Sequence, residues 1–225
     1  MNISKLSKHI IVYLAGLFLL GLGITFSVKA DFGVSPVSSL AYSITLITNL
    51  SLGITVFLAN ILFIIVQIII SKEFKLTNYF AQIMMTFIFS LFVDITMRIG
   101  SFLPIANTLF IQIIYLILSL VCIALATFLY LHTSLPLMPY DTLLPTISNR
   151  FNIQISKTKV LCDVSTVSSA LILSFIFLHS LGSVGIGTLV SALLVGRILG
   201  VFIILFKKSL LNWMNSEEYL KRKQA

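Results

Sequence analysis

Residues 136–150 read PLMPYDTLLPTISNR, and residues 36–49 read PVSSLAYSITLITN. The first segment holds three prolines, an aspartate and an arginine, and the second begins with Pro36. Neither is long and apolar enough to cross a bilayer, since a spanning helix needs about 20 apolar residues. A broken backbone inside lipid must also find its hydrogen-bond partners within the protein. We therefore expect both segments to be short re-entrant or interfacial elements, packed among membrane helices.

The rest of the chain is apolar enough to have lipid as its solvent. Hydrophobic residues make up 58% of the 225 residues and charged residues only 10%, whereas soluble domains carry about 25% charged residues. Six apolar runs are long enough to cross the bilayer, so the sequence predicts an all-α integral membrane fold with six transmembrane helices. The runs cover roughly 10–28, 53–70, 76–97, 106–131, 159–180 and 185–206.

Basic residues are distributed unevenly about these spans. With the N-terminus in the cytoplasm and neither short segment crossing, 12 lysines and arginines lie on the cytoplasmic side and only Lys29 and Arg98 on the outer side. If both short segments crossed, Lys72 and Lys75 would move outside. The distribution therefore predicts a multi-pass protein of the cell membrane with cytoplasmic termini. A single transmembrane domain over 1–206 would precede a basic, amphipathic cytoplasmic tail over 207–225.

The two halves of the chain resemble each other at a shift of 103 residues. Each half reads as a long span, a short broken segment and two further spans, over about 10–98 and 106–206. Three crossings in each half would invert the second half relative to the first, which is the architecture of many secondary transporters. Identical pairs at this shift include Pro36 and Pro139, Leu40 and Leu143, Ile44 and Ile147, Asn49 and Asn152, and Thr55 and Thr158.

A charged residue interrupts the last span. Arg197 lies near the middle of GIGTLVSALLVGRILG, where a charge costs about 2.5–3.5 kcal/mol on insertion scales. It needs a partner from another segment, and Asp141 and Asp163 are the candidates. Asp163 follows Lys159 by four residues and can pair with it on the same helix face, so we expect Arg197 to pair with Asp141. The alternative is a buried ion pair that only fixes helix packing.

A second group of charges is expected at the outer ends of the first and third spans. Asp94 precedes Arg98 by four residues on one helix face, and Lys29 and Asp31 end the first span at a similar depth. These side chains either form a cluster or reach individually toward the membrane surface. Hydroxyls of the first short segment either line a polar cavity or satisfy frayed backbone groups. The candidate substrate- or ion-binding residues are therefore Arg197, Asp141, Asp94, Asp31, Lys29, Asp163, Ser35 and Ser38.

Motifs of enzymes are absent from the sequence. It contains no nucleophile elbow, no H-E-x-x-H and no phosphate-binding Gly-Lys loop, so we expect no enzyme activity, no cofactor and no metal site. No basic run carries interleaved aromatic residues, so nucleic acid is not an expected partner. Cys122 and Cys162 lie inside apolar runs and are interpreted as small apolar residues.

Four stretches carry a resemblance to a known family. These are ADFGVSPVSSL at 30–40, FVDITM at 92–97, KVLCDV at 159–164 and GTLVSALLVG at 187–196. Together they resemble the bacterial YczE/YyaS/YitT-type multi-pass membrane proteins, most closely the uncharacterised subgroup of integral membrane proteins among them. The resemblance covers about residues 10–206. It implies a multi-pass protein of the bacterial inner membrane and no established substrate.

Two classes of function agree with these features. The first is a secondary transporter or permease for a small molecule or ion, in which Arg197 favours an anionic substrate. The second is a non-transporting accessory or sensor protein, or the substrate-binding subunit of a larger importer. The lipid bilayer is the expected partner in each case, and a homodimer is a possible assembly.

Overall fold

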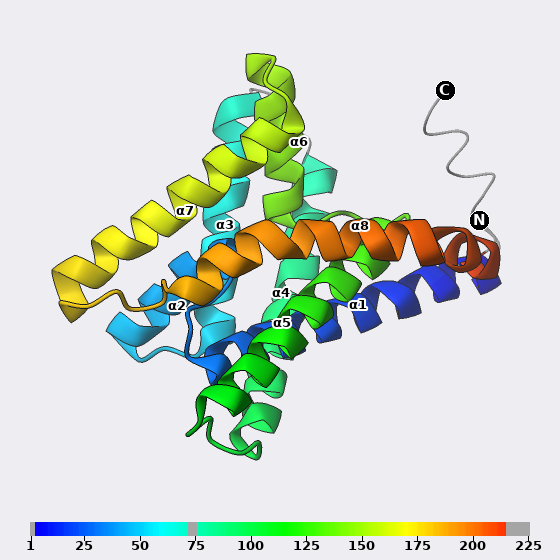
Figure 1. Ribbon diagram of the computed structural model, residues 1–225. Helices are drawn as coiled ribbons and strands as arrows, with labels where there is room; N and C mark the ends of the chain where they lie inside the picture. The colour runs from blue at the N-terminus through cyan, green and yellow to red at the C-terminus, as the bar shows by residue number, and fades with distance from the viewer. Residues whose placement is uncertain (1–2, 72–75, 215–225) are drawn as a thin grey trace.

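The computed structural model of the protein describes residues 3–71 and 76–214, which form α-helices joined by short loops (Figure 1). By length and composition, six helices can cross a membrane, and they confirm the six spans expected from the sequence. The all-helical, multi-pass fold is therefore confirmed. The six are α1 (Ile3–Ala30), α3 (Leu52–Ser71), α4 (Leu76–Ser101), α5 (Leu109–Leu131), α7 (Ile155–Leu178) and α8 (Ile186–Met214).

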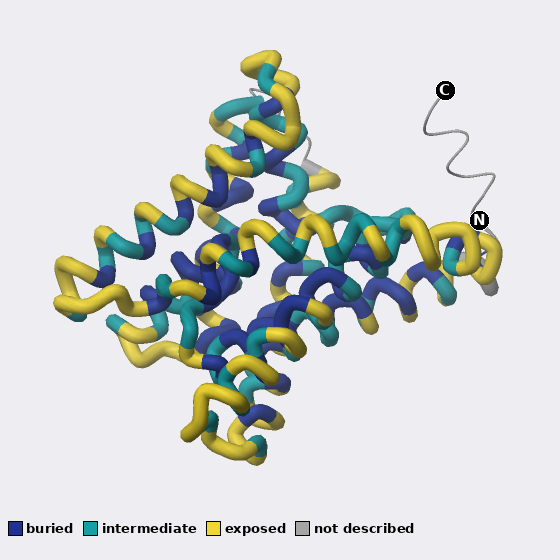
Figure 2. The backbone as a smooth tube through the Cα atoms, in the orientation of Figure 1, coloured by how far each residue is buried: buried dark blue, intermediate teal, exposed yellow. Residues whose placement is uncertain are grey.

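Apolar side chains cover the outer faces of these helices. On α8, Ile186 is 74% exposed and Ile204 is 84% exposed. Figure 2 shows buried residues gathered where the helices cross and exposed residues along their outer faces and tips. A soluble monomer rarely exposes so much contiguous apolar surface. Lipid contact explains it, because the bilayer core is as apolar as these side chains.

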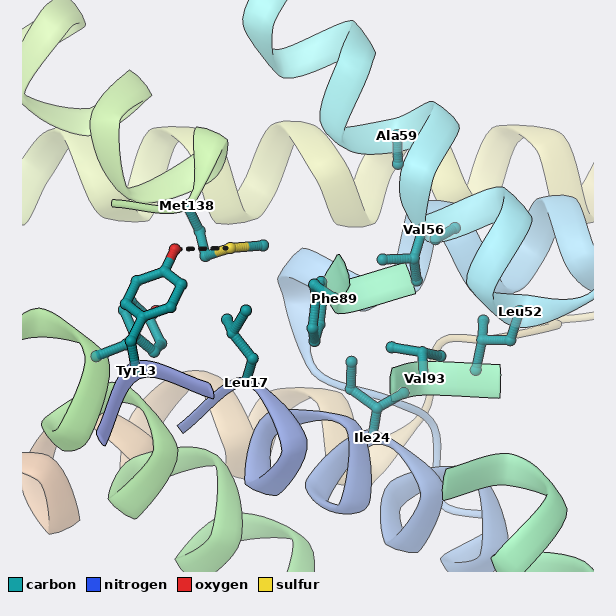
Figure 3. Packing of buried hydrophobic residues seen from close by; sticks show 11 residues of the cluster. Tyr13, Leu17, Ile24, Leu52, Val56, Ala59, Phe89, Val93 and Met138 are labelled. Carbon is teal, nitrogen blue, oxygen red and sulfur yellow. Dashed lines mark hydrogen bonds between the residues drawn. The ribbon is translucent and has the colours of Figure 1, made fainter. Parts of the chain in front are cut away.

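The main core forms where α1 packs against α4 and α5. Tyr13, Leu17 and Ile24 of α1 are buried there, together with residues of α3 and α4 (Figure 3). Small residues let the backbones approach closely. A Cβ atom added to Gly23 would lie 2.6 Å from the Cγ1 atom of Ile123 on α5.

The two short segments form α2 (Pro36–Thr48) and α6 (Pro139–Phe151). Each begins with proline, which tolerates the first helical turn because no intrahelical bond needs its missing N–H group. Each ends at an asparagine in the left-handed conformation, a common way to stop a helix. The bounds of α2 and α6 are 103 residues apart at both ends, as are the first residues of α3 and α7. The repeat is therefore visible in the helix boundaries, while the inverted orientation of the halves stays a prediction.

The last helix is longer than the sequence predicted. Instead of ending near residue 206, α8 continues to Met214. Leu211 and Met214 pack against Val12 near the start of α1, and the Lys8 Nζ atom donates a hydrogen bond of 2.9 Å to the backbone oxygen of Trp213. Residues 207–214 of the expected tail thus extend a span, and residues 215–225 lie outside the described residues. The beginning of α1 and the end of α8 lie side by side (Figure 1).

Backbone hydrogen bonds join two of the loops between the helices. The Val34 N–H group donates to the Ser183 oxygen at 3.0 Å, and the Gly187 N–H group donates to the Phe32 oxygen at 2.7 Å. These bonds join the loop before α2 to the loop before α8. Between them, Gly33 has a φ of +90°, and a Cβ atom there would lie 2.4 Å from the Gly185 nitrogen. The loops can therefore pair only while position 33 carries glycine.

We expect Gly33→Ala to lower the thermal midpoint of the purified protein in detergent. An L side chain at this φ adds strain of about 1–3 kcal/mol, and the contact with Gly185 adds a clash. The matched control is Gly200→Ala on α8, where an added Cβ would meet nothing within 4 Å and where alanine is the better helix former. Its midpoint should stay equal or rise. Equal midpoints for the two variants would contradict the loop pairing.

Candidate functional site

A cavity of about 290 Å³ lies where the two short helices begin. Ser35, which directly precedes α2, and Ser38, in the first turn of α2, both line it, and Tyr140 and Asp141 line it from the first turn of α6. The six long helices supply the remaining walls, which are mostly apolar. A mostly apolar cavity with a few convergent polar groups is the usual form of a small-molecule site.

Two carboxylates face this cavity and have different partners. The Tyr130 hydroxyl donates a hydrogen bond of 2.6 Å to Asp141 Oδ2. Asp163 accepts a hydrogen bond from the Tyr140 hydroxyl, and its Oδ2 atom forms an ion pair with Lys159 Nζ at 2.5 Å. The ion pair between Lys159 and Asp163 expected from their spacing is thus confirmed. The partner of Asp141 is thus an uncharged hydroxyl group, whereas the charge of Asp163 is balanced by the ammonium group of Lys159.

The expected ion pair between Arg197 and Asp141 is wrong. No ion pair of Arg197 occurs among residues 3–71 and 76–214, and its side chain is exposed. Helix geometry gives the reason. Gly196 and Leu199 face the cavity, and each residue of a helix is rotated by about 100° from the one before it. Position 197 is therefore turned away from the cavity although its neighbours line it.

Several lining residues occur in pairs that are 103 positions apart. Ser38 corresponds to Asp141, and Asn60 on α3 corresponds to Asp163 on α7. Sequence reasoning missed Asn60, yet the repeat could have found it by moving Asp163 back into the first half. It also missed Tyr130 and Tyr140 as partners of the carboxylates, because an aromatic residue in an apolar run gives no sign of which side chain it contacts.

Asp94 takes a structural position instead of facing the cavity. Its Oδ1 atom accepts a hydrogen bond of 2.8 Å from the Gly53 N–H group, and its Oδ2 atom accepts one of 2.9 Å from the Ser51 hydroxyl. These donors lie at the start of α3, where backbone N–H groups have no intrahelical acceptor. Asp94 on α4 therefore caps α3. Among the described residues it forms no ion pair with Arg98, which is exposed.

The other charges of the expected cluster do not line the cavity. Asp31 is exposed, with a φ of 57°, at the end of α1. Lys29 is partly buried in the last turn of α1. Neither is brought against Asp94 by an ion pair among the described residues, so the expected cluster at the outer side does not form there.

Hydroxyl groups of α2 divide between the cavity and the helix packing. Ser35 Oγ donates to Ser38 Oγ at 3.2 Å, and both residues line the cavity. Ser43, further along α2, lies instead within hydrogen-bond distance of Ser174 and Ser183 in a buried cluster. Ser35 and Ser38 thus fit the expectation of a polar cavity, while Ser39 Oγ, which donates to the Pro36 oxygen at 2.7 Å, fits the expectation that hydroxyls satisfy backbone groups.

An amide pair links α3 and α4. Gln67 Nε2 approaches Gln82 Oε1 at 3.4 Å and donates to the Pro139 oxygen at 2.7 Å. This second hydrogen bond holds the first residue of α6 against α3. No group of three or more His, Cys, Asp or Glu side chains that could hold a metal ion is found within the described ranges.

We expect Asp94→Ala to lower the thermal midpoint of the protein, because removing an N-terminal cap costs about 0.5–2 kcal/mol. Arg98→Gln provides the comparison. It should leave the midpoint within error, since the Arg98 side chain is exposed and makes no ion pair with Asp94 among the described residues. Differential scanning fluorimetry in detergent measures both variants. Equal destabilisation by both would mean that Asp94 acts through an ion pair with Arg98.

Comparison with known proteins agrees with the resemblance found in the four sequence stretches. An uncharacterised protein of Haemophilus influenzae is 26% identical over 196 residues, which cover 87% of this chain and 84% of that protein. The uncharacterised protein YyaS of Bacillus subtilis is 26% identical over 201 residues, which cover 89% of this chain and 94% of YyaS. No solved structure matches the chain. Residues 7–204 match the model of DUF6198, a family of unknown function, and the chain belongs to that family.

Proposed function

We propose that this protein is a secondary transporter of a small molecule and that the cavity at the start of α2 and α6 is its substrate site. The observation that carries the proposal is the convergence of two short, proline-started helices on one cavity between halves that repeat at 103 residues. Paired short helices at the repeat interface are the typical site of substrate in transporters built from inverted repeats.

The walls of the cavity also support transport rather than catalysis. The lining is mostly apolar, and its charged side chains are Asp141, Lys159 and Asp163. The sequence lacks the motifs of a nucleophile, a phosphate-binding loop or a metal-dependent hydrolase. An apolar cavity with a few polar groups is the usual form of a site that binds a small molecule. Transport therefore requires only that the cavity open alternately to each side of the membrane.

The remaining parts of the proposal concern topology and assembly. We place both termini in the cytoplasm and the protein in the cell membrane, on the basis of the basic residues counted above. The proximity of Lys8 and Trp213 supports a common side for the two termini. A homodimer stays a prediction that contacts within one chain do not test. An accessory or sensor role through the tail depends on residues 215–225, which lie outside the described residues.

The expectation of an anionic substrate loses its basis in this structure. The anionic substrate expected from the sequence depended on Arg197 reaching the centre of the protein. Arg197 is exposed and does not line the cavity. The charge preference must therefore come from the residues that do line it.

Alternating access can be tested without knowing the substrate. In a chain with Cys122→Ala and Cys162→Ala, Ser38→Cys or Asn60→Cys places one thiol in the cavity. A charged, membrane-impermeant thiol reagent is applied to intact cells and, separately, to inside-out vesicles. We expect labelling from both sides, because the cavity would open to each in turn.

The control for this experiment is Leu205→Cys on the exposed apolar face of α8. Its thiol would face lipid and should react from neither side. Labelling of both cavity thiols from a single side would overturn transport by alternating access and favour a sensor or a binding subunit. Labelling from neither side would mean that the cavity is a closed part of the core.

A further inference from the structure

We infer that the substrate of this cavity is an organic cation, whose positive group lies at Asp141 and whose hydrocarbon part fills the apolar walls. The inference rests on the proposed function, since it names the class of molecule that the transport site accepts. Four features of the described residues carry it: the charge balance, the aromatic rings, an unpartnered hydroxyl and the form of the helix ends.

The charges that face the cavity are unbalanced. Asp163 is paired with Lys159 at 2.5 Å, while Asp141 receives only the hydroxyl hydrogen bond of Tyr130 among the described residues. With both carboxyl groups ionised, two carboxylates and one ammonium group leave one net negative charge. Burying a carboxylate without a cation is costly, so a bound cation would supply the partner that the chain itself does not give to Asp141.

Aromatic rings line the same cavity as Asp141. Phe63, Phe89, Tyr130 and Tyr140 all line the cavity, and Phe63 and Tyr140 meet edge to face with their ring centroids 5.5 Å apart. The faces of aromatic rings attract cations, including quaternary ammonium groups, and this attraction increases when water is excluded. The same rings provide apolar contact for the hydrocarbon part of the molecule.

A buried hydroxyl on α8 lacks a partner in the same cavity. Ser191 lines it, is 2% exposed, and its Oγ atom makes no hydrogen bond within the protein. A buried polar atom that lacks a partner costs about 1–3 kcal/mol. An N–H group of a bound ammonium ion, or a water carried with it, would satisfy this oxygen. Ser191 therefore marks a second polar contact for the substrate.

The ends of the short helices do not favour an anion. The N-terminus of a helix attracts anions through its free N–H groups, but α2 and α6 both begin with proline, which has none. In α2 the Ser38 N–H group already donates to the Ser35 oxygen at 3.0 Å. In α6 the first turn already contains Asp141, whose negative charge interacts favourably with the helix dipole and would repel an anion.

The inference can be tested with two small aromatic ions of opposite charge. At neutral pH benzylammonium is a cation with three N–H groups, and phenylacetate is an anion with the same benzyl group. Each is titrated into the purified full-length protein in detergent while the thermal midpoint is recorded. We expect benzylammonium to raise the midpoint, phenylacetate to leave it unchanged, and Asp141→Asn to weaken the binding of the cation at least tenfold.

Two further variants separate binding from folding. Asp31→Asn is the same substitution at an exposed acid outside the cavity, and it should leave the affinity unchanged. Lys159→Gln frees Asp163 and should strengthen the binding of the cation severalfold, a gain that damage to the fold would not produce. Lys159 suits this change because its side chain is 45% exposed.

Binding of phenylacetate alone, binding of neither ion, or a cation affinity that Asp141→Asn and Lys159→Gln both leave unchanged would overturn the inference. The thiol-labelling experiment keeps this result separate from the proposed function. Labelling of Ser38→Cys from both sides without binding of the cation would refute the cationic substrate and leave transport standing. Binding of the cation with one-sided labelling would refute transport and support the cation as the ligand of a sensor or binding subunit.

Discussion

Lipid tails offer no hydrogen bonds, so backbone N–H and C=O groups at membrane depth must find partners inside the protein. The long helices meet this requirement within themselves. The short helices and the loops that join them cannot, and much of the tertiary structure serves them. Asp94 caps the start of α3, Gln67 binds the first carbonyl of α6, and the loop before α2 exchanges backbone hydrogen bonds with the loop before α8.

The same constraint explains where glycine and serine occur. The loops can exchange hydrogen bonds only at close approach, which Gly33 and Gly185 permit. Buried serines of α2 and α7 find polar partners within an otherwise apolar interior. Ser43, for example, lies within hydrogen-bond distance of Ser174 and Ser183. Packing energy alone would favour larger apolar residues at such positions. Small and hydroxyl-bearing residues are used because irregular backbone lies beside them.

The short length of α2 and α6 also leaves room for the cavity. A pair of continuous helices would fill the centre with packed side chains, whereas the starts of α2 and α6 leave about 290 Å³ between them. The first turns bring Ser38 and Asp141 to this space at equivalent positions of the repeat. The second half has the acid Asp141 at the position where the first half has the hydroxyl of Ser38. It also has the acid Asp163 where the first half has the amide of Asn60. This difference between the halves gives the cavity its two carboxyl groups.

The sequence by itself determined the membrane class, the six spans, the two short segments and the repeat, because hydrophobic length and proline placement act locally along the chain. It also determined the ion pair of Lys159 with Asp163, since four residues bring side chains together on one helix face. Only the tertiary structure decided which charges meet across helices. Arg197 faces away from Asp141, and Asp94 caps a neighbouring helix, because the rotation of each helix about its axis is set by the packing of many side chains at once. No charge spacing along one segment carries that information, so the residues that line the cavity emerged only when the helices were assembled.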